Sequence, residues 1–334
     1  MDAYNRGVIA PLSEFALIER FFRRPARDPA VVVGNGDDGA VVRPSPDCEL
    51  VFSVDMLIEG RHFLADVDPA RLGHKTLAVN LSDLAAMGAT PRWALLAVAV
   101  PDNDEGWLCA FARGFFALAD AHNVELIGGD TTRGPRNLCV TIIGEVPAGA
   151  ALTRAGAKAD DDVYVSGAIG AAALALAAMQ GRTALTGDAF AEARACLETP
   201  QPRIGLGIAL RGVATAAIDV SDGLLGDLRH ILAASGVGAD LELAALPRPS
   251  SIQQKLDSAE RELALDCLLA GGDDYELCFT ASRNARARVA GIARELALRL
   301  TRMGTITREP GLVVRAQDGR PLATLPQAFD HFAL

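Results

Sequence analysis

Short apolar segments that end in glycine and aspartate recur along this chain of 334 residues, and they restrict its fold more than any other feature. Runs typical of strands are 31–33, 50–54, 93–100, 138–146, 162–166 and 276–280. Candidate helices between them are 107–122, 171–180 and 224–234. Such alternation predicts an α/β or α+β fold, with sheets covered by helices. Ser221, just ahead of the last of these helices, is expected to act as its N-cap.

A segment rich in glycine and alanine, Pro147–Asp162, separates two regions of alternating strands and helices. The length of the chain leaves room for two ordinary domains. We therefore predict an N-terminal domain at 1–150 and a C-terminal domain at 151–334.

Several classes of protein are disfavoured by composition. The longest apolar runs, such as Trp93–Val100, are far shorter than the roughly 18 residues that a membrane span needs. No basic start followed by an apolar core, as in a signal peptide, is present at Met1–Ile9. The six cysteines form no CxxC pair, which argues against a zinc cluster and suits a reducing cytoplasm.

The charge of the chain bears directly on its ligands. The net charge of −10 disfavours nucleic acid, because such binding needs clustered lysine and arginine. Only three lysines occur among the basic residues, Lys75, Lys158 and Lys255. If the protein handles a polyphosphate, we expect metal ions to neutralise most of its charge, and metal ions need carboxylates.

The aspartates are placed where such metal ions would bind. They follow predicted strands or precede helices, mostly beside glycine, at Asp37, Asp38, Asp55, Asp83, Asp130, Asp219, Asp222, Asp273 and Asp274. In α/β sheets that edge is where ligands bind. Backbone N–H groups at helix starts favour anions, while carboxylates beside them repel phosphate unless a cation intervenes. The pattern therefore predicts phosphate, Mg²⁺ and aspartate in successive layers.

Other interpretations of these residues remain open at this point. An aspartate after glycine is commonly only a turn residue, and Gly167–Gly170 is more typical of a tight turn than of a phosphate loop. The chain has no GxxxxGK[ST] motif and no protein-kinase catalytic loop, which excludes both kinase classes at the level of motifs.

A non-catalytic metal-binding module is the alternative from a different class. Its ligands would be close together, as in the 12-residue EF-hand loop, whereas these extend from Asp38 to Asp222.

Eight segments match one known family in order and spacing. They are GDD at 36–38, SVD at 53–55, HF at 62–63, KTLAVNLSDLAAMGA at 75–89, LIGGDTTRGP at 126–135, LTRAGAK at 152–158, IDVSDGL at 218–224 and GGDDYEL at 271–277. The chain resembles the thiamine-monophosphate kinase family, of the aminoimidazole-ribonucleotide-synthetase-like superfamily. The 75–89 and 126–135 segments are the specific ones.

The resemblance implies a fold and an activity. The fold would be a two-domain α/β (α+β) structure. Its N-terminal domain would bind ATP and Mg²⁺ and form a homodimer through its sheet, and its C-terminal α/β sandwich would close the cleft. The activity would be direct in-line transfer of the γ-phosphoryl group of ATP to thiamine monophosphate, assisted by several Mg²⁺ ions. A cytoplasmic enzyme that binds neither nucleic acid nor membrane is expected.

The resemblance also assigns roles to particular residues. Metal ligands would be Asp38, Ser53, Val54 (through its backbone oxygen), Asp55, Asp83, Asp130, Asp219 and Asp222. ATP contacts would be Gly129, Asp130, Arg154 and Ser221. Asp130, Arg154 and Asp222 would be catalytic, His62 and Asp273 would contact the thiamine substrate, and Asp37 and Asp274 are left as turn residues.

Two positions depart from the family pattern. Asp273 stands where glutamate is frequent, so a direct contact would become water-mediated. Pro326 stands where a tryptophan is expected to pack on the thiamine ring, and we expect Phe329 to take over that contact.

Related enzymes of the superfamily fit less well. Selenophosphate synthetase needs a reactive cysteine or selenocysteine near its N-terminus. In this chain the first cysteine is Cys48. The hydrogenase-maturation relative ends in cysteine, whereas this chain ends in Leu334. No single residue excludes aminoimidazole-ribonucleotide synthetase. The segments 80–89 and 128–135, however, resemble the thiamine enzyme more closely.

Overall fold

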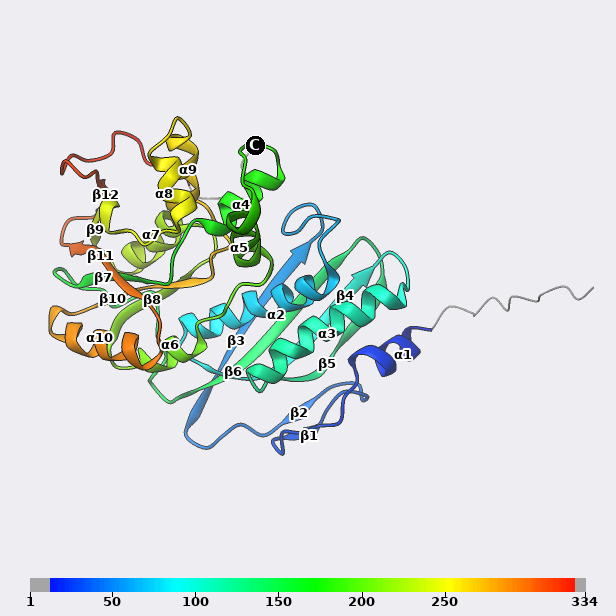
Figure 1. Cartoon of the computed structure of the whole chain (residues 1–334). Helices are drawn as coiled ribbons and strands as arrows, with labels where there is room; N and C mark the ends of the chain where they lie inside the picture. The colour runs from blue at the N-terminus through cyan, green and yellow to red at the C-terminus, as the bar shows by residue number, and fades with distance from the viewer. Residues whose placement is uncertain (1–12, 328–334) are drawn as a thin grey trace, which may run out of the picture. The chain divides into compact units, whose positions relative to one another are not determined.

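The computed structural model describes residues 13–327, and the chain forms two compact units (Figure 1). The first unit comprises the chain up to Arg43 together with Val54–Thr76 and Trp93–Thr141. The second unit comprises Pro44–Ser53, Leu77–Arg92 and the chain from Ile142 onward. Both units are therefore discontinuous in sequence.

One sheet is formed by strands from the first half of the chain. Its spatial order is β3 (Cys48–Ile58), β6 (Asn137–Pro147), β4 (Thr90–Val100) and β5 (Glu125–Arg133). β4 and β5 run parallel, with Leu96 opposite Gly129. A parallel pair needs a crossover, and α3 (Glu105–Ala121) provides it, lying beside α2 (Pro69–Ala86) in Figure 1. The preceding segment contains α1 (Glu14–Leu17), a π-helical turn (Ile18–Phe22), β1 (Val31–Val33) and β2 (Val41–Val42).

A second sheet lies in the second unit. Its strands, in spatial order, are β12 (Gly311–Arg315), β9 (Gly238–Glu242), β11 (Leu300–Thr307), β7 (Asp162–Ser166), β10 (Glu276–Ala281) and β8 (Ala214–Val220). All neighbours are antiparallel except β12 and β9. The α-helices of this part are α4 (Ala171–Met179), α5 (Gly187–Glu198), α6 (Ile204–Ala209), α7 (Leu224–Ser235), α8 (Ser250–Leu256), α9 (Arg261–Leu269) and α10 (Arg286–Glu295). Short 3₁₀ turns occupy Leu243–Ala245 and Arg283–Ala285.

The predicted mixed α/β class is confirmed, and each predicted strand is present. Every residue of β7 and β10 is buried, which explains why both appear in the sequence as continuous runs. β3 is longer than its predicted core at 50–54 because its outer residues alternate between buried and exposed. In the part of the chain from 13 to 327, we find no helix with the length and apolar character needed to cross a membrane.

The predicted N-cap at Ser221 is wrong. α7 begins at Leu224, and the residue at the N-cap is Gly223, which has no side chain to offer. A Cβ on Gly223 would lie 2.5 Å from the carbonyl carbon and oxygen of Ala270, so only glycine fits there. The N–H group of Ser221 donates instead to a residue inside the helix, described below.

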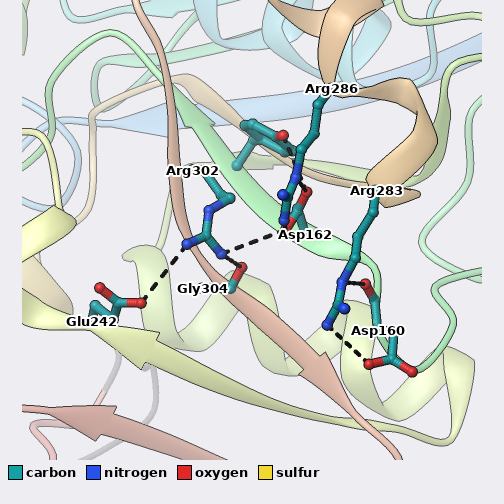
Figure 2. Close-up of polar contacts among 8 residues, drawn as sticks. Asp160, Asp162, Glu242, Arg283, Arg286, Arg302 and Gly304 are labelled. Carbon is teal, nitrogen blue, oxygen red and sulfur yellow. Dashed lines mark hydrogen bonds and ion pairs between the residues drawn. The ribbon is translucent and has the colours of Figure 1, made fainter. Parts of the chain in front are cut away.

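A buried aspartate joins three elements at one end of the second sheet. Asp162 of β7 is fully buried and accepts two hydrogen bonds from the Arg286 guanidinium of α10, at 2.6 and 2.7 Å. Figure 2 shows that Arg302 of β11 also reaches Asp162, at 3.5 Å, and that Arg283 reaches Asp160. The Arg286 hydrogen bonds, with both guanidinium charges, hold the pKa of Asp162 below its usual value despite burial.

We expect Asp162→Asn to destabilise the fold by about 2 kcal/mol at neutral pH, because charged hydrogen bonds to a buried group are lost. The pKa of Asp162 is depressed on folding, so its contribution is present above the ordinary carboxylate pKa of about 4 and disappears as the pH falls through the folded value. Urea unfolding at pH 7 and below pH 4 checks this. Equal destabilisation at both pH values would contradict the expectation.

Candidate active site

Two of the predicted metal ligands line one cavity in the first unit. This cavity of about 480 Å³ has the carboxylate residues Asp37, Asp38 and Asp130 in its wall. Its apolar lining consists of Phe15, Ile18, Phe22, Leu96 and Leu126. The structure therefore brings Asp38 and Asp130 to a single hollow with an acidic part and an apolar part.

Gly129 determines how closely β5 approaches its neighbour in this cavity. Its φ is +153°, and a Cβ there would lie 1.9 Å from the carbonyl oxygen of Leu96 on β4. Any side chain would push the paired strands apart. The exposed Asp130 follows directly on this close-packed backbone.

Arg23 was not singled out in the sequence and also lines this cavity. Its guanidinium is close to Gly36, where a Cβ would lie 3.3 Å from the Arg23 Cζ atom. Arg23 Nη1 donates to Glu19 Oε2 at 2.7 Å. No motif signals this arginine, because it comes from a helical turn far from the glycine–aspartate segment that it meets.

Asp83, in the second unit, is surrounded by groups that shift its pKa in opposite directions. The Ser53 hydroxyl of β3 donates to its carboxylate, and Arg154 is close enough to act on its charge. Burial nevertheless raises the pKa of Asp83, with the serine and the arginine opposing the shift. Asp55 follows Ser53 by two residues on β3, so both lie on the same face of the strand.

Asp219 is held by the residue next to Asp83. The hydroxyl of Ser82 on α2 donates to Asp219 Oδ2 at 2.7 Å, and Asp219 is 5% exposed. Consecutive residues of α2 therefore contact two of the predicted ligands. Asp222, three residues further on, is exposed.

Asp227 was also not singled out in the sequence, and it lies beside the predicted ligand Asp222. It lies in the first turn of α7 and accepts from the backbone N–H groups of Ser221 and Asp222, each at 3.1 Å. Burial, followed by the charge of Asp222, raises the pKa of Asp227 to about 7. Its position in a helical first turn, just after SDG, is the sequence signal that identifies it.

The loop that carries Asp273 is bonded to the Ser221 loop. Asp273 N donates to Ser221 O and Tyr275 N donates to Val220 O, both at 2.8 Å. Asp273 and Tyr275 have φ values of +67° and +51°, a region that side chains rarely occupy. Such strain persists only where surrounding contacts determine the backbone, and it is concentrated at functional sites. The Tyr275 hydroxyl also donates to Asp273 Oδ1 at 3.1 Å.

Asp274 has a larger role than that of a turn residue, which corrects the interpretation above. Its carboxylate accepts from Gly170 N at 2.8 and 3.0 Å, at the start of α4. Burial raises the pKa of Asp274 well above its usual value. The N-cap of α4 thus donates to a carboxylate of the protein itself, as the loop ahead of α7 does to Asp227. This agrees with the interpretation of Gly167–Gly170 as a turn rather than a phosphate loop.

Two of the three lysines are poorly placed for phosphates. Lys75 and Lys255 are 3% and 8% exposed. Lys255 Nζ binds Glu260 at 2.6 Å and Thr183 at 2.5 Å, and Lys75 Nζ lies 3.5 Å from the carbonyl oxygen of His62. Lys158 alone is exposed. Burial of two of these cations strengthens the argument that other positive charges must neutralise a polyphosphate.

His62 is oriented by its own loop. Its Nδ1 accepts from Ile58 N at 3.0 Å, so a neutral imidazole carries its proton on Nε2. Nε2 is then the atom able to donate to a ligand. The other predicted aromatic contact, Phe329, lies outside the described residues.

The chain is similar to known proteins along most of its length. It matches the family models "AIR synthase related protein, N-terminal domain" over residues 36–146 and "AIR synthase related protein, C-terminal domain" over residues 158–317. It is 44% identical over 323 residues to the thiamine-monophosphate kinase of Escherichia coli, covering 96% of this chain and 98% of that protein. The corresponding enzyme of Salmonella typhimurium is 43% identical over 324 residues, with the same shares covered.

Solved structures agree with these matches. The crystal structure of thiamine-monophosphate kinase from Stenotrophomonas maltophilia superposes with a TM-score of 0.84 at 46% identity, covering 93% of this chain and 98% of that one. AaThiL complexed with AMPPCP and TMP superposes with a TM-score of 0.76 at 26% identity, covering 89% and 91%.

Proposed function

The chain belongs to the thiamine-monophosphate kinase family, and on this premise we propose that it transfers the γ-phosphoryl group of ATP directly to thiamine monophosphate, giving thiamine diphosphate. The related AaThiL complex, which holds AMPPCP and TMP, supports these two substrates. The observation that carries the proposal is the pairing of Ser53 with Asp83 and of Ser82 with Asp219, with Arg154 near Asp83.

The proposed chemistry makes modest demands on the side chains. The acceptor is an anionic phosphate oxygen, which forms the new bond to the γ-phosphorus while the bond to the bridging oxygen breaks and ADP leaves. No strong base is needed, and positioning and charge stabilisation are the main tasks. We assign Arg154 to the transferring phosphoryl group, with Gly129, Asp130 and Ser221 holding ATP.

The donor set fits Mg²⁺. Among residues 13–327, no three His, Cys, Asp or Glu side chains form a ready-made metal cluster. Mg²⁺ usually takes one or two carboxylates and completes its shell with phosphate oxygens and water, so separate carboxylates suit it. We assign to it Asp38, Ser53, Val54, Asp55, Asp83, Asp130, Asp219 and Asp222. Bound there, Mg²⁺ would neutralise phosphate charge and so permit two polyanions to meet.

Val54 can offer only a backbone atom to a metal ion. Its side chain is 60% exposed and lies on the opposite face of β3 from Ser53 and Asp55. Only its carbonyl oxygen is therefore available to a metal ion.

The cavity beside Asp38 and Asp130 suits the nucleotide. An aromatic base needs an apolar wall, and its phosphates need the acidic part, where cations gather. Phe15 lines this cavity and is 81% exposed, so its ring is free to cover a base. We therefore assign the base to the Phe15, Ile18 and Phe22 wall.

Phe15→Ala should raise the KM for ATP about 5- to 10-fold, because ring–base stacking contributes about 1–3 kcal/mol. The KM for thiamine monophosphate should stay the same. Val32→Ala, which removes an exposed apolar side chain of β1, is the matched control. An unchanged KM for ATP, or an equal rise in both KM values, would remove Phe15 from the site.

The thiamine substrate is assigned to His62 and Asp273. His62 would donate from Nε2, since Nδ1 is occupied by Ile58 N. The Tyr275 hydroxyl donates to Asp273 Oδ1, and the shorter Asp273 would reach the substrate through a water molecule. The contact between Phe329 and the thiamine ring stays a prediction.

We also assign a homodimer formed through the first sheet. β3 carries an exposed apolar row, Phe52, Val54, Met56 and Ile58, on one face. Apolar rows of this kind mark interaction surfaces, and β3 is an edge strand of its sheet. The division of roles between 1–150 and 151–334 stays a proposal. A light-scattering mass of 35.0 kDa, that of one chain, would contradict the dimer.

Incubation of the protein with ATP, Mg²⁺ and thiamine monophosphate tests the function. We expect thiamine diphosphate and ADP in equal amounts, separated and measured by chromatography. A non-catalytic metal-binding module would yield neither product. Failure to form thiamine diphosphate would overturn the proposal.

A further inference from the structure

The loop just ahead of α7 donates its backbone N–H groups to a side chain inside the helix. Ser221, Asp222 and Gly223 precede the helix, and Gly223 at the N-cap has no side chain to accept a hydrogen bond. Asp227, inside the helix, accepts instead from the N–H groups of this preceding loop. Its Oδ2 atom accepts from Ser221 N and Asp222 N at 3.1 Å, and Gly223 N also contributes a hydrogen bond.

This arrangement is reciprocal and buried. Asp227 N donates back to Gly223 O at 3.0 Å, so loop and helix turn are bonded in both directions. Asp227 is 4% exposed, and its neighbours Leu224, Leu225 and Leu228 are buried as well. A carboxylate in such surroundings is costly unless N–H groups satisfy it, so the interaction determines one backbone path.

The same loop is held from its other sides. Ser221 O accepts from Asp273 N at 2.8 Å, and Asp219 accepts from Ser82 at 2.7 Å. Asp222 remains exposed, on backbone whose N–H groups are all directed to Asp227. The loop thus presents oxygen atoms rather than N–H groups to a ligand, which favours a cation over a bare phosphate.

We propose that Asp227 is a positioning residue, which holds Asp219, Ser221 and Asp222 in the geometry that binds the metal ion. The inference rests on the proposed function, because it takes Asp219 and Asp222 as ligands. In this proposal Asp227 acts through the N–H groups of the loop and is not itself a ligand. Residues that orient metal ligands typically contribute 10- to 100-fold to metal affinity.

The test measures metal binding directly, with Mn²⁺ alone as the probe and free Mn²⁺ followed by electron paramagnetic resonance on the full chain. Asp227→Ala removes the acceptor and should weaken Mn²⁺ binding at least 10-fold. Asp227→Asn keeps an acceptor oxygen and should bind within about 3-fold of the wild type. Asp188→Ala, which removes an exposed acid from the first turn of α5, is the matched control and should bind normally.

The outcomes separate the inference from the function on which it rests. Normal Mn²⁺ binding by Asp227→Ala would overturn the inference, as would equal losses in Asp227→Ala and Asp227→Asn. Asp222→Ala tests the ligand assignment: if it binds Mn²⁺ and forms thiamine diphosphate normally, the proposed site is wrong whatever Asp227 does. If Asp227→Ala is recovered unfolded, Asp227→Glu displaces the acceptor and keeps its charge. It should weaken Mn²⁺ binding at least 3-fold, and an unchanged affinity would overturn the inference.

Discussion

Asp130→Asn is expected to lower kcat/KM for ATP on the order of 10³-fold, the largest effect among the single changes considered for this protein. Its carboxylate is exposed on the wall of the cavity that also contains Asp38, and the amide would bring no negative charge to hold a cation there. Loss of one charge-stabilising group in a phosphoryl-transfer site commonly costs 10²–10³-fold. Initial rates over a range of ATP and Mg²⁺ concentrations measure the effect.

A matched control separates this effect from general loss of charge. Asp120 of α3 lies in the same unit and forms surface ion pairs with Arg24 and Arg27 at 2.9 and 2.8 Å. Exposed pairs contribute little, so Asp120→Asn should retain full activity. If Asp130→Asn lost less than about 10-fold, Asp130 could not be both a metal ligand and an ATP contact.

Gly129→Ala should both destabilise the protein and abolish tight ATP binding. The new methyl group would lie 1.9 Å from Leu96 O, a backbone atom in the hydrogen-bonded β4–β5 pair that cannot move aside cheaply. We expect a loss of about 3 kcal/mol or more in unfolding free energy, typical of overpacking combined with an unfavourable backbone conformation. Urea unfolding and the KM for ATP report the two effects.

Gly134→Ala provides the comparison. A Cβ there would meet the Ala99 Cβ atom at 3.6 Å, an ordinary contact, and its backbone is not left-handed. That variant should change the unfolding free energy by less than about 1 kcal/mol. Equal stability of the two variants would show that β4 and β5 can separate at Gly129, contrary to our expectation.

Aspartates beside two helix starts bear on how the proposed site would bind phosphate. Two helices that follow glycine motifs, α4 and α7, would each favour an anion at their N-termini. Asp274 accepts from Gly170 N at the N-cap of α4, and Asp227 accepts from the N–H groups of the loop ahead of α7, so a carboxylate of the chain itself lies beside each helix start. With Lys75 and Lys255 buried as well, our proposal leaves the phosphates to Mg²⁺ and arginine.

Much of the fold follows from local pattern. β7 and β10 are buried along their whole length, so their central residues are apolar and they appear as short continuous runs, with polar residues such as Asp162 and Glu276 at their ends. The family was likewise accessible, because motifs such as 75–89 and 126–135 keep their residues and spacing. The roles of the individual site residues remain assignments made from that resemblance.

The sequence by itself determined the element types, the family and the residues to suspect. Only the tertiary structure decided which partner each of them has. Ser82 meets Asp219 across 137 positions, and Asp274 meets Gly170 across 104. No local propensity encodes such pairs, because they depend on how sheets and helices pack. The same reason explains the error at Ser221: a serine ahead of a helix is a plausible N-cap by local pattern, but the N-cap is Gly223 and the backbone N–H of Ser221 donates to the buried Asp227 carboxylate.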